Sequence, residues 1–212
     1  MSSVREINVQ GVRINALNLD SATAEVERAV REKEKGYICV QGVHGVTEAQ
    51  TDSHFRSVLN NAFLVTPDGV PMVWMGRLAG DRSIRRVYGP DLMLRVCEDG
   101  VSRGYRHFLY GGCEGVAEKL QASMEERFPG IEFVGTYTPP FRPLNDDEEA
   151  DLIAQVKAAR PDIIWVGLST PKQDRFMAEY IDRLDTTLMF GVGAAFDFHA
   201  GMVPVSYTHQ TL

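Results

Sequence analysis

The sequence predicts an α/β protein with a Rossmann-like, mostly parallel sheet, helices on both faces and an N-terminal β-hairpin. Short apolar runs that read as buried strands alternate with longer helical segments through the second half of the chain. A strand covered on both faces is apolar throughout, and parallel strands need a crossover, which is usually a helix. The length of 212 residues suits one such domain.

The first elements are predicted from alternation and from capping residues. Residues 5–15 alternate polar and apolar around Gln10-Gly11, which indicates the hairpin. Asp20 or Ser21 can cap a helix that runs to about Lys35. The elements expected next are a strand at 37–40, a helix ending near 62 and a strand at 63–65.

The second half gives the clearest alternation of strands and helices. Strands are expected at 107–110, 131–134, 163–166 and 188–190, and helices at 116–128, 145–159 and 171–184. Three of these strands stop at glycines, namely Gly111-Gly112, Gly167 and Gly191. Ligands of open α/β sheets bind just outside the carboxyl ends of the strands, so we expect the site at these glycines.

Composition narrows the class of protein. The net charge of −7 argues against a nucleic-acid partner, which needs a basic surface. The sequence has neither a signal-peptide pattern at its start nor an apolar run long enough to span a bilayer. Cys39, Cys97 and Cys113 are widely spaced in apolar surroundings and form no CxxC pair, so we expect reduced, buried thiols in a cytoplasmic protein.

We expect residues 1–201 to form a single α/β domain, and a division into two lobes is left open. Residues 202–212 end the chain without a helix, and the segment from Val205 to His209 is what a common sequencing adapter encodes in one reading frame. We therefore interpret 202–212 as a non-native or truncated tail.

Asp68 is the candidate catalytic carboxylate. It follows a strand in the turn Thr66-Pro67-Asp68-Gly69, where a side chain can point into a cleft. A carboxylate in such a position can act as a general base that takes the proton of a substrate hydroxyl. The alternative is an Asx-turn carboxylate, which is the commoner use of such a residue when spacing alone is considered.

Two strand-to-helix junctions could hold a phosphate. The amides of Gly111 and Gly112 could approach one, although the pair is also an ordinary turn and matches neither GxGxxG nor a P-loop. After Gly167, Ser169 or Thr170 could cap a helix with Pro171 at its first position. There Lys172 would add a cation and Gln173 a side-chain amide to the phosphate site. The alternative is an ordinary helix cap with exposed polar residues.

Further candidates follow the other strands. Arg86 could offset phosphate charge, or lie on a solvated face. Gly193 and Asp197 follow the last strand, where Asp197 could accept hydrogen bonds from a ribose or simply start a helix. His44 and Gly45 lie in a glycine-rich loop after the first core strand. No DxD pair follows a strand, which favours chemistry without a metal.

In combination, these motifs resemble the WecG/TagA/CpsF family of bacterial glycosyltransferases. The matching stretches are DSHFRSVLNNAFLVTPDGVPMVWMGRLAG, RRVYGPDLM, FLYGGCEGVAEKL, FPGIEFVGTYTPPF, PDIIWVGLSTPKQDRFMAEYIDRL and GVGAAFDFHAG, and they cover most of the chain from about Gly36 to Gly201. The resemblance implies a metal-independent, inverting transfer from a UDP-sugar. The sugar would be N-acetylmannosamine, its uronic acid or glucose, and the acceptor a sugar linked to undecaprenyl diphosphate, in cell-surface polysaccharide synthesis at the inner face of the membrane.

The resemblance also assigns roles. It implies that Asp68 is the base, that Arg86 and Gln173 handle the donor, and that Asp197 lies in the nucleotide-side motif. The predicted catalytic residues are Asp68, Arg86 and Gln173. The predicted substrate-binding residues are His44, Gly45, Gly69, Gly111, Gly112, Gly167, Ser169, Lys172, Gly193 and Asp197.

The chain departs from the family pattern at two places. The Thr-x-Asn pattern of the family is replaced around Gln41, where His44 is the candidate substitute. The C-terminal segment that completes the site and contacts the membrane in the family is missing. A non-catalytic nucleotide-binding subunit therefore stays an alternative, as does an NAD-type oxidoreductase, against which the absent GxGxxG argues. A homo-oligomer is also left open.

Overall fold

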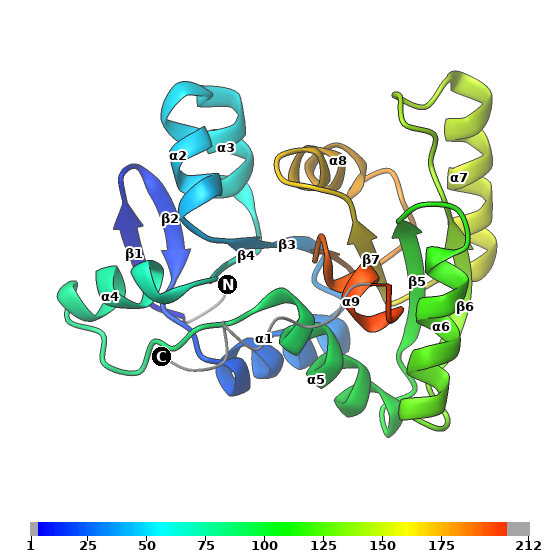
Figure 1. Cartoon of the computed structure of the whole chain (residues 1–212), viewed down its shortest axis with the longest axis horizontal. Coiled ribbons are helices and arrows are strands. Elements are labelled where there is room, and N and C mark those ends of the chain that lie inside the picture. Colours follow the sequence, from blue (N-terminus) through cyan, green and yellow to red (C-terminus); the bar gives the residue numbers. More distant parts are fainter. Residues whose placement is uncertain (1–3, 203–212) are drawn as a thin grey trace.

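The computed structural model describes residues 4–202, and the predicted tail from residue 203 onward lies outside them. Within the described residues, six strands form a parallel sheet in the order β4-β3-β8-β7-β5-β6. The strands are β3 (Gly36–Gln41), β4 (Leu64–Pro67), β5 (Arg106–Gly111), β6 (Glu132–Tyr137), β7 (Ile163–Gly167) and β8 (Leu188–Gly191). The predicted α/β class is confirmed (Figure 1).

The N-terminal hairpin is confirmed as well. Strand β1 (Glu6–Val9) pairs antiparallel with β2 (Val12–Asn15), and Gln10 and Gly11 turn the chain with φ of 52° and 85°. The hairpin is tied to the main sheet because the Asn15 side-chain oxygen accepts a hydrogen bond of 2.7 Å from the amide of Val65 in β4.

Helices cover both faces of the sheet, and each face has its own apolar core. One core holds buried side chains of α2 (Val43–Thr51), α3 (Ser53–Asn61), α4 (Val70–Leu78), α7 (Asp146–Ala159) and α8 (Lys172–Tyr180). The other core holds those of α1 (Leu19–Glu32), α5 (Gly89–Val101), α6 (Val116–Arg127) and α9 (Ala195–His199). Strand residues alternate between the two cores, which explains why the strands read as unbroken apolar runs.

Strand β7 shows this alternation directly. Ile163 and Trp165 belong to the core beneath α1, α5 and α6, whereas Ile164 and Val166 belong to the core beneath α7 and α8. All four side chains are buried. Fully apolar strands with two covered faces require helices on both sides, as the sequence predicted.

Several helix limits differ from the sequence expectation. Asn18, rather than Asp20 or Ser21, caps α1, and it forms a capping box with Ser21. The helix expected to end near residue 62 is two helices, because the Asp52 side chain accepts from the Phe55 amide at 2.8 Å and starts α3. Helices α4 and α9 were not expected from the sequence, because α4 is almost entirely apolar and α9 is short.

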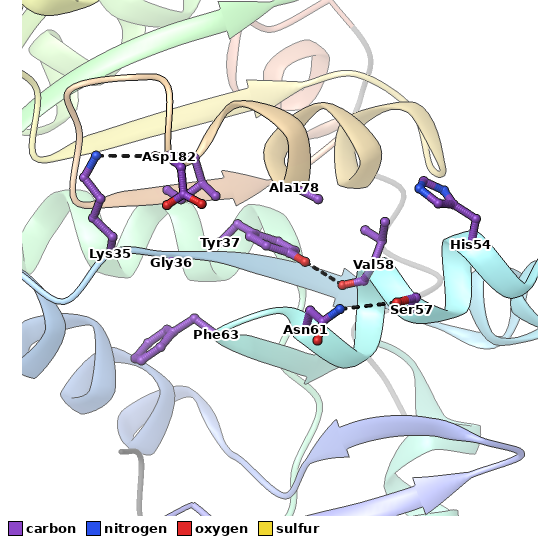
Figure 2. A pocket seen from close by; sticks show the side chains of 11 residues that line it. Lys35, Gly36, Tyr37, His54, Ser57, Val58, Asn61, Phe63, Ala178 and Asp182 are labelled. Carbon is purple, nitrogen blue, oxygen red and sulfur yellow. Dashed lines mark hydrogen bonds between the residues drawn. The ribbon is translucent and has the colours of Figure 1, made fainter.

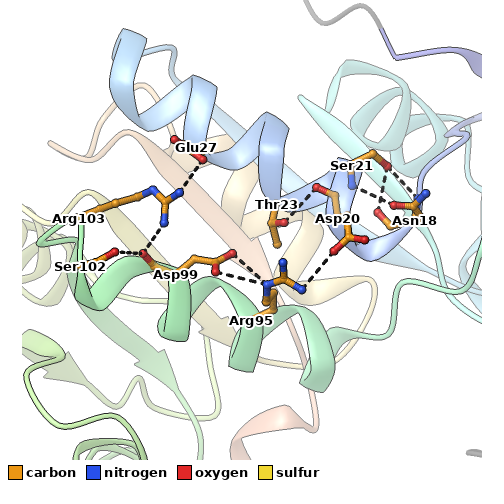
Figure 3. Close-up of polar contacts among 9 residues, drawn as sticks. All are labelled: Asn18, Asp20, Ser21, Thr23, Glu27, Arg95, Asp99, Ser102 and Arg103. Atoms are coloured by element: carbon orange, nitrogen blue, oxygen red, sulfur yellow. Dashed lines mark hydrogen bonds and ion pairs between the residues drawn. The ribbon is translucent and has the colours of Figure 1, made fainter.

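A polar seam joins α1 to α5 on the outer side of the second core (Figure 3). Arg103 pairs with Glu27 at 2.8 Å, and Arg95 pairs with Asp20 at 3.2 Å and with Asp99 at 3.1 Å. These are partly exposed ion pairs within the fold, which contribute little stability individually. The seam orients two helices and needs no ligand.

Candidate functional site

The carboxyl ends of the central strands border a cavity of about 540 Å³. Its lining comes from Val40 near the end of β3, from the loops after β4, β5, β7 and β8, and from α5, α9 and the loop before α7. Of the predicted site residues, those that line it are Asp68, Gly112, Gly167, Ser169, Lys172, Gln173, Gly193 and Asp197. This is the place where open α/β sheets bind their ligands.

The strand-end glycines have a packing reason. Gly111 and Gly167 are neighbours in the register of β5 and β7, and a Cβ on Gly111 would lie 2.6 Å from the Gly167 carbonyl oxygen. A Cβ on Gly167 would lie 2.5 Å from the ring of Phe196 in α9. Gly111 also has a φ of 118°, so its glycine is required by the turn. Gly111 does not line the cavity.

Two of the glycine amides that the sequence offered to a phosphate are already used. The amide of Gly112 donates to the Gly167 carbonyl at 3.0 Å, and that of Gly193 donates to the Gln173 side-chain oxygen at 3.0 Å. In this structure these two amides hold neighbouring loops together. Direct contact of these two amides with a phosphate stays a prediction, and it would require them to leave the acceptors that they have in this structure.

Asp68 is positioned by the ends of two neighbouring strands. Its amide donates to the Gln41 carbonyl at 2.9 Å, which extends the β3–β4 pairing by one step. Gly69 follows with a φ of 98°, a conformation that favours glycine, and it lets the chain enter α4 at once. A Cβ on Gly42 would lie 3.0 Å from the Asp68 carbonyl oxygen, so the two loops approach closely.

Arg86 pairs with Asp68. Its Nε lies 3.1 Å from Asp68 Oδ1, and both side chains are about one quarter exposed. The guanidinium also lies over the Tyr88 ring, 4.2 Å from its centroid. The amide of Val87 donates to the Pro67 carbonyl at 2.8 Å, which fixes this segment beside the end of β4. Arg86 is not among the residues that line the cavity, but both of these partners, Asp68 and Tyr88, are.

The loop from Gly167 to α8 brings Ser169, Lys172 and Gln173 to the cavity. Helix α8 begins at Lys172, with Pro171 at its cap position after a cis peptide bond, and no side chain caps it. The predicted cap by Ser169 or Thr170 is therefore wrong. Gln173 is 3% exposed, and its oxygen is bonded to Gly193. Its side chain thus links the loops after β7 and β8.

A buried carboxyl lies beneath this loop. Asp174 is fully buried, and its Oδ1 accepts a hydrogen bond of 2.9 Å from the Gln41 side chain. Burial raises the pKa of Asp174 to about 6, against opposing hydrogen bonds from neighbouring side chains. Gln41 fills the space beside Gly45, where a Cβ would lie 1.7 Å from its side-chain oxygen. The pair connects α8 to the strand end that holds Asp68.

Three predicted residues, His44, Gly45 and Gly69, do not line the cavity, each for a local reason. His44 is exposed on the first turn of α2, and Gly45 is buried against Gln41. Gly69 serves the turn after Asp68. Asp197 lines the cavity from the first turn of α9, so it is a helix-start carboxylate, and its binding role stays a prediction.

The structure adds residues that sequence reasoning missed. Tyr88, Cys113 and Phe141 line the cavity, and Phe141 is 96% exposed at its rim. Cys113 is exposed in the turn after Gly112, which corrects the expectation of three buried thiols. Exposed aromatic rings in a Pro-rich loop, such as Phe141 between Pro140 and Pro143, are the signal that could have identified this rim.

A second cavity of about 440 Å³ lies between α3, α8 and the amino end of β3 (Figure 2). Several of its polar side chains bond to one another or to the backbone. The Tyr37 hydroxyl donates to the Val58 carbonyl at 2.6 Å, and Lys35 Nζ donates to the Leu184 carbonyl at 2.9 Å. This cavity is at the opposite end of β3 from Gln41, so it belongs to a different region from Asp68.

Within residues 4–202, no group of three His, Cys, Asp or Glu side chains could hold a metal ion. Likewise, no helix in this part of the chain is long and apolar enough to cross a membrane. The expectation of metal-independent chemistry stays a prediction.

Comparison with known proteins agrees with the motifs. The sequence profile described as the glycosyl transferase WecG/TagA/CpsF family matches residues 7–206. The chain belongs to this family. The resemblance found in the motifs is confirmed, and with it the prediction of a glycosyltransferase.

Three relatives share the name N-acetylglucosaminyldiphosphoundecaprenol N-acetyl-beta-D-mannosaminyltransferase. The protein of Bacillus spizizenii is 29% identical over 187 residues, which are 87% of this chain and 70% of that protein. The Bacillus subtilis protein is 28% identical, covering 72% of this chain and 57% of its own length. That of Staphylococcus aureus is 26% identical, covering 74% and 59%.

Proposed function

We propose that this protein transfers an N-acetylmannosamine-type sugar, with inversion, from a UDP-sugar to a sugar linked to undecaprenyl diphosphate. The observation that carries the proposal is the position of Asp68. Its carboxylate is on the edge of the strand-end cavity, paired with Arg86 at 3.1 Å. The relatives, named for transfer onto an N-acetylglucosaminyldiphosphoundecaprenol, support the acceptor class. Synthesis of a cell-wall polysaccharide of the teichoic acid type fits these names.

The donor diphosphate is proposed to lie at the start of α8. Lys172 is the first residue of this nine-residue helix and lines the cavity. The amino end of a helix favours an anion through its dipole and unpaired amides. Because the amides of Gly112 and Gly193 are engaged, side-chain cations supply more of the charge than the sequence suggested. The exposed ring of Phe141 suits a nucleobase at the opposite rim.

The proposed chemistry is a single displacement. Asp68 takes the proton of the acceptor hydroxyl as the oxygen of that hydroxyl attacks the anomeric carbon of the donor sugar. The bond from that carbon to the UDP oxygen breaks, and the electron pair leaves with UDP. Lys172 and Arg86 offset the charge that develops on the diphosphate. Attack from the face opposite to UDP inverts the anomeric configuration. No metal is part of this proposal.

Transfer from UDP-N-acetylmannosamine to a diphosphate-linked N-acetylglucosamine acceptor tests the proposal. We expect Asp68→Asn to reduce kcat by about 100- to 10,000-fold, the usual contribution of a general base. UDP affinity, measured by calorimetry, should change little because the amide keeps the shape of the carboxylate. Asp197→Asn is the comparison variant on the nucleotide side, where we expect a change in UDP affinity. Full turnover by Asp68→Asn would refute the role of the base.

A non-catalytic nucleotide-binding subunit is the second candidate. The chain spans 57% and 59% of the length of the Bacillus subtilis and Staphylococcus aureus relatives. UDP binding without transfer or sugar hydrolysis would support it. In either case we propose action at the inner face of the cell membrane, since the acceptor is lipid-linked.

A further inference from the structure

Helix α4 is apolar on both of its faces. Met72, Val73 and Gly76 are buried against the protein. The opposite face carries Pro71, Trp74, Met75 and Leu78, all exposed, with Trp74 at 61% and Leu78 at 83%. These four positions follow the i, i+3, i+4, i+7 spacing of one helical stripe. We call them the α4 outer face. A contiguous exposed apolar face on a helix marks an interaction surface.

Basic side chains surround the end of this helix. Residues 69–87 contain four arginines and one aspartate, in a chain whose net charge is −7. Arg77, Arg82 and Arg85 are exposed, and none of them pairs with a carboxylate of residues 4–202. Arg5 adds a fourth guanidinium by donating to the Ala79 carbonyl at 2.7 Å. The surface that adjoins the α4 outer face is thus locally cationic.

The α4 outer face is close to the proposed catalytic base. The helix begins at Val70, two residues after Asp68, and has nine residues. At about 1.5 Å per residue, it extends about 13 Å from the site. A lipid-linked acceptor has its diphosphate in the headgroup layer, so the catalytic carboxylate must operate within a short distance of the bilayer surface.

We propose that the α4 outer face, with Arg77, Arg82 and Arg85, docks on the surface of an anionic phospholipid bilayer. The inference rests on the proposed function for the nature of the acceptor. Trp74 and Leu78 enter the boundary between headgroups and acyl chains, where indole rings are favoured. The arginines contact lipid phosphates, each adding an attraction that salt screens. Asp68 is then held beside the layer that contains the acceptor diphosphate.

Charge favours a bilayer over a second copy of the chain. A two-fold contact in which the two α4 outer faces pack in parallel would place the same arginines of both copies close together, and like charges oppose such a contact. An anionic lipid surface instead neutralises them. The arginines beside the α4 outer face thus complement lipid phosphates better than they complement the same surface of a second copy.

The two tryptophans make the test direct, because Trp74 is exposed and Trp165 is fully buried. The 212-residue chain is mixed with vesicles of phosphatidylcholine, with or without phosphatidylglycerol, and tryptophan emission is recorded. We expect a blue shift with anionic vesicles only, and its disappearance in Trp74→Phe. Acyl chains brominated near the headgroup should quench the emission of the wild type and not that of the variant.

Sedimentation with sucrose-loaded vesicles measures the affinity. We expect Leu78→Ser to weaken partitioning about tenfold, as expected for one buried leucine. Arg82→Glu combined with Arg85→Glu should weaken it by a similar factor, and the effect should decrease with salt. Matched controls are Phe141→Ser, which removes an exposed apolar ring elsewhere, and Arg31→Glu on α1. Thermal unfolding checks that each variant is folded.

An absent blue shift with anionic vesicles would overturn the inference, as would equal partitioning of Leu78→Ser and the wild type. A dimer in sedimentation velocity that Leu78→Ser dissociates would overturn it in favour of a second copy. The two proposals fail separately: transfer to a soluble, short-chain acceptor tests the chemistry of Asp68 without vesicles, while vesicle binding tests the α4 outer face without turnover.

Discussion

Individual side chains at the site have environments that can be measured one at a time. Asp174 is the most informative, since it is fully buried and yet ionisable, and it bonds to Gln41 beneath the loop that carries Lys172. Cys113 is its counterpart on the surface, because it is an exposed thiol that lines the cavity. Asp174 therefore reports on the residues that support the site, and Cys113 reports on whether a ligand occupies the cavity.

The raised pKa of Asp174 predicts a pH-dependent stability. Its pKa is about 6 in the folded protein against 3.8 when solvated, so the protonated form favours folding. This contribution is fully present below pH 3.8 and is lost as pH rises through 6. Asp174→Asn stays neutral and should avoid the loss. We expect its free energy of unfolding to rise relative to the wild type by up to about 3 kcal/mol between pH 4 and pH 8.

Urea unfolding at both pH values measures this difference. The comparison with the wild type is needed because burial lowers the pKa of His107 to about 4, which gives the opposite slope in the same range. Asp185→Asn, at an exposed position, is the control and should show no difference. A constant gap between Asp174→Asn and wild type across this range would contradict the prediction.

Cys113 predicts a single reactive thiol in the native protein. Cys39 and Cys97 are buried, and burial raises the pKa of both thiols far above the usual range. A disulfide reagent such as Ellman's should therefore modify one thiol rapidly, and Cys113→Ser should remove that phase. UDP at ten times its Kd should slow the modification about tenfold if it occupies the cavity. Unchanged kinetics with UDP would place the nucleotide elsewhere.

At the scale of elements, the junction of β3 with α2 supports the site through close packing. Gly45 is in the first turn of α2, and the space for its missing side chain is taken by Gln41. Gln41 in turn holds Asp174 in α8, and its carbonyl binds the amide of Asp68. The glycine thus has a structural role, where the sequence suggested contact with substrate.

Gly45→Ala should destabilise the protein, although alanine is the better helix former. The new Cβ would lie 1.7 Å from the Gln41 side-chain oxygen, so Gln41 or the start of α2 must move. We expect a loss of about 1–3 kcal/mol by urea unfolding, as for other overpacked positions. Thr47→Ala, exposed on the same helix, is the control. A variant as stable as the control would show that Gln41 relocates at no cost.

Elements with strong sequence periodicity were predicted well, and contacts between them were not. The apolar runs of β5, β7 and β8 and the cap of α7 at Asn145 follow from local patterns. That the Gly112 amide would meet the Gly167 carbonyl depends on the register of two strands separated by more than 50 residues. No local pattern contains that register. For the same reason, the sequence did not show which apolar residues of α4 are buried in the core and which form the exposed α4 outer face.

For the whole molecule, strand order decides which parts of the chain meet at the site. Strands β3 and β4 lie on one side of β8 and carry Asp68, while β7, β5 and β6 lie on the other and carry the loops proposed for the donor. Predicted site residues distant in sequence, such as Asp68 and Gln173, line one cavity for this reason. The motifs predicted that convergence because parallel strands present their carboxyl ends together, whereas their order followed only from the fold.

The location of β8 between two groups of strands has an evolutionary consequence. Both strands on the Asp68 side of β8, β3 and β4, come from the N-terminal half of the chain. The three strands on its other side, β5, β6 and β7, come from the C-terminal half. Under the proposed function, a homologous exchange of the two halves would combine the acceptor preference of one parent with the nucleotide-sugar preference of the other. Such a hybrid enzyme would have to preserve the hydrogen bonds between β3 and β8.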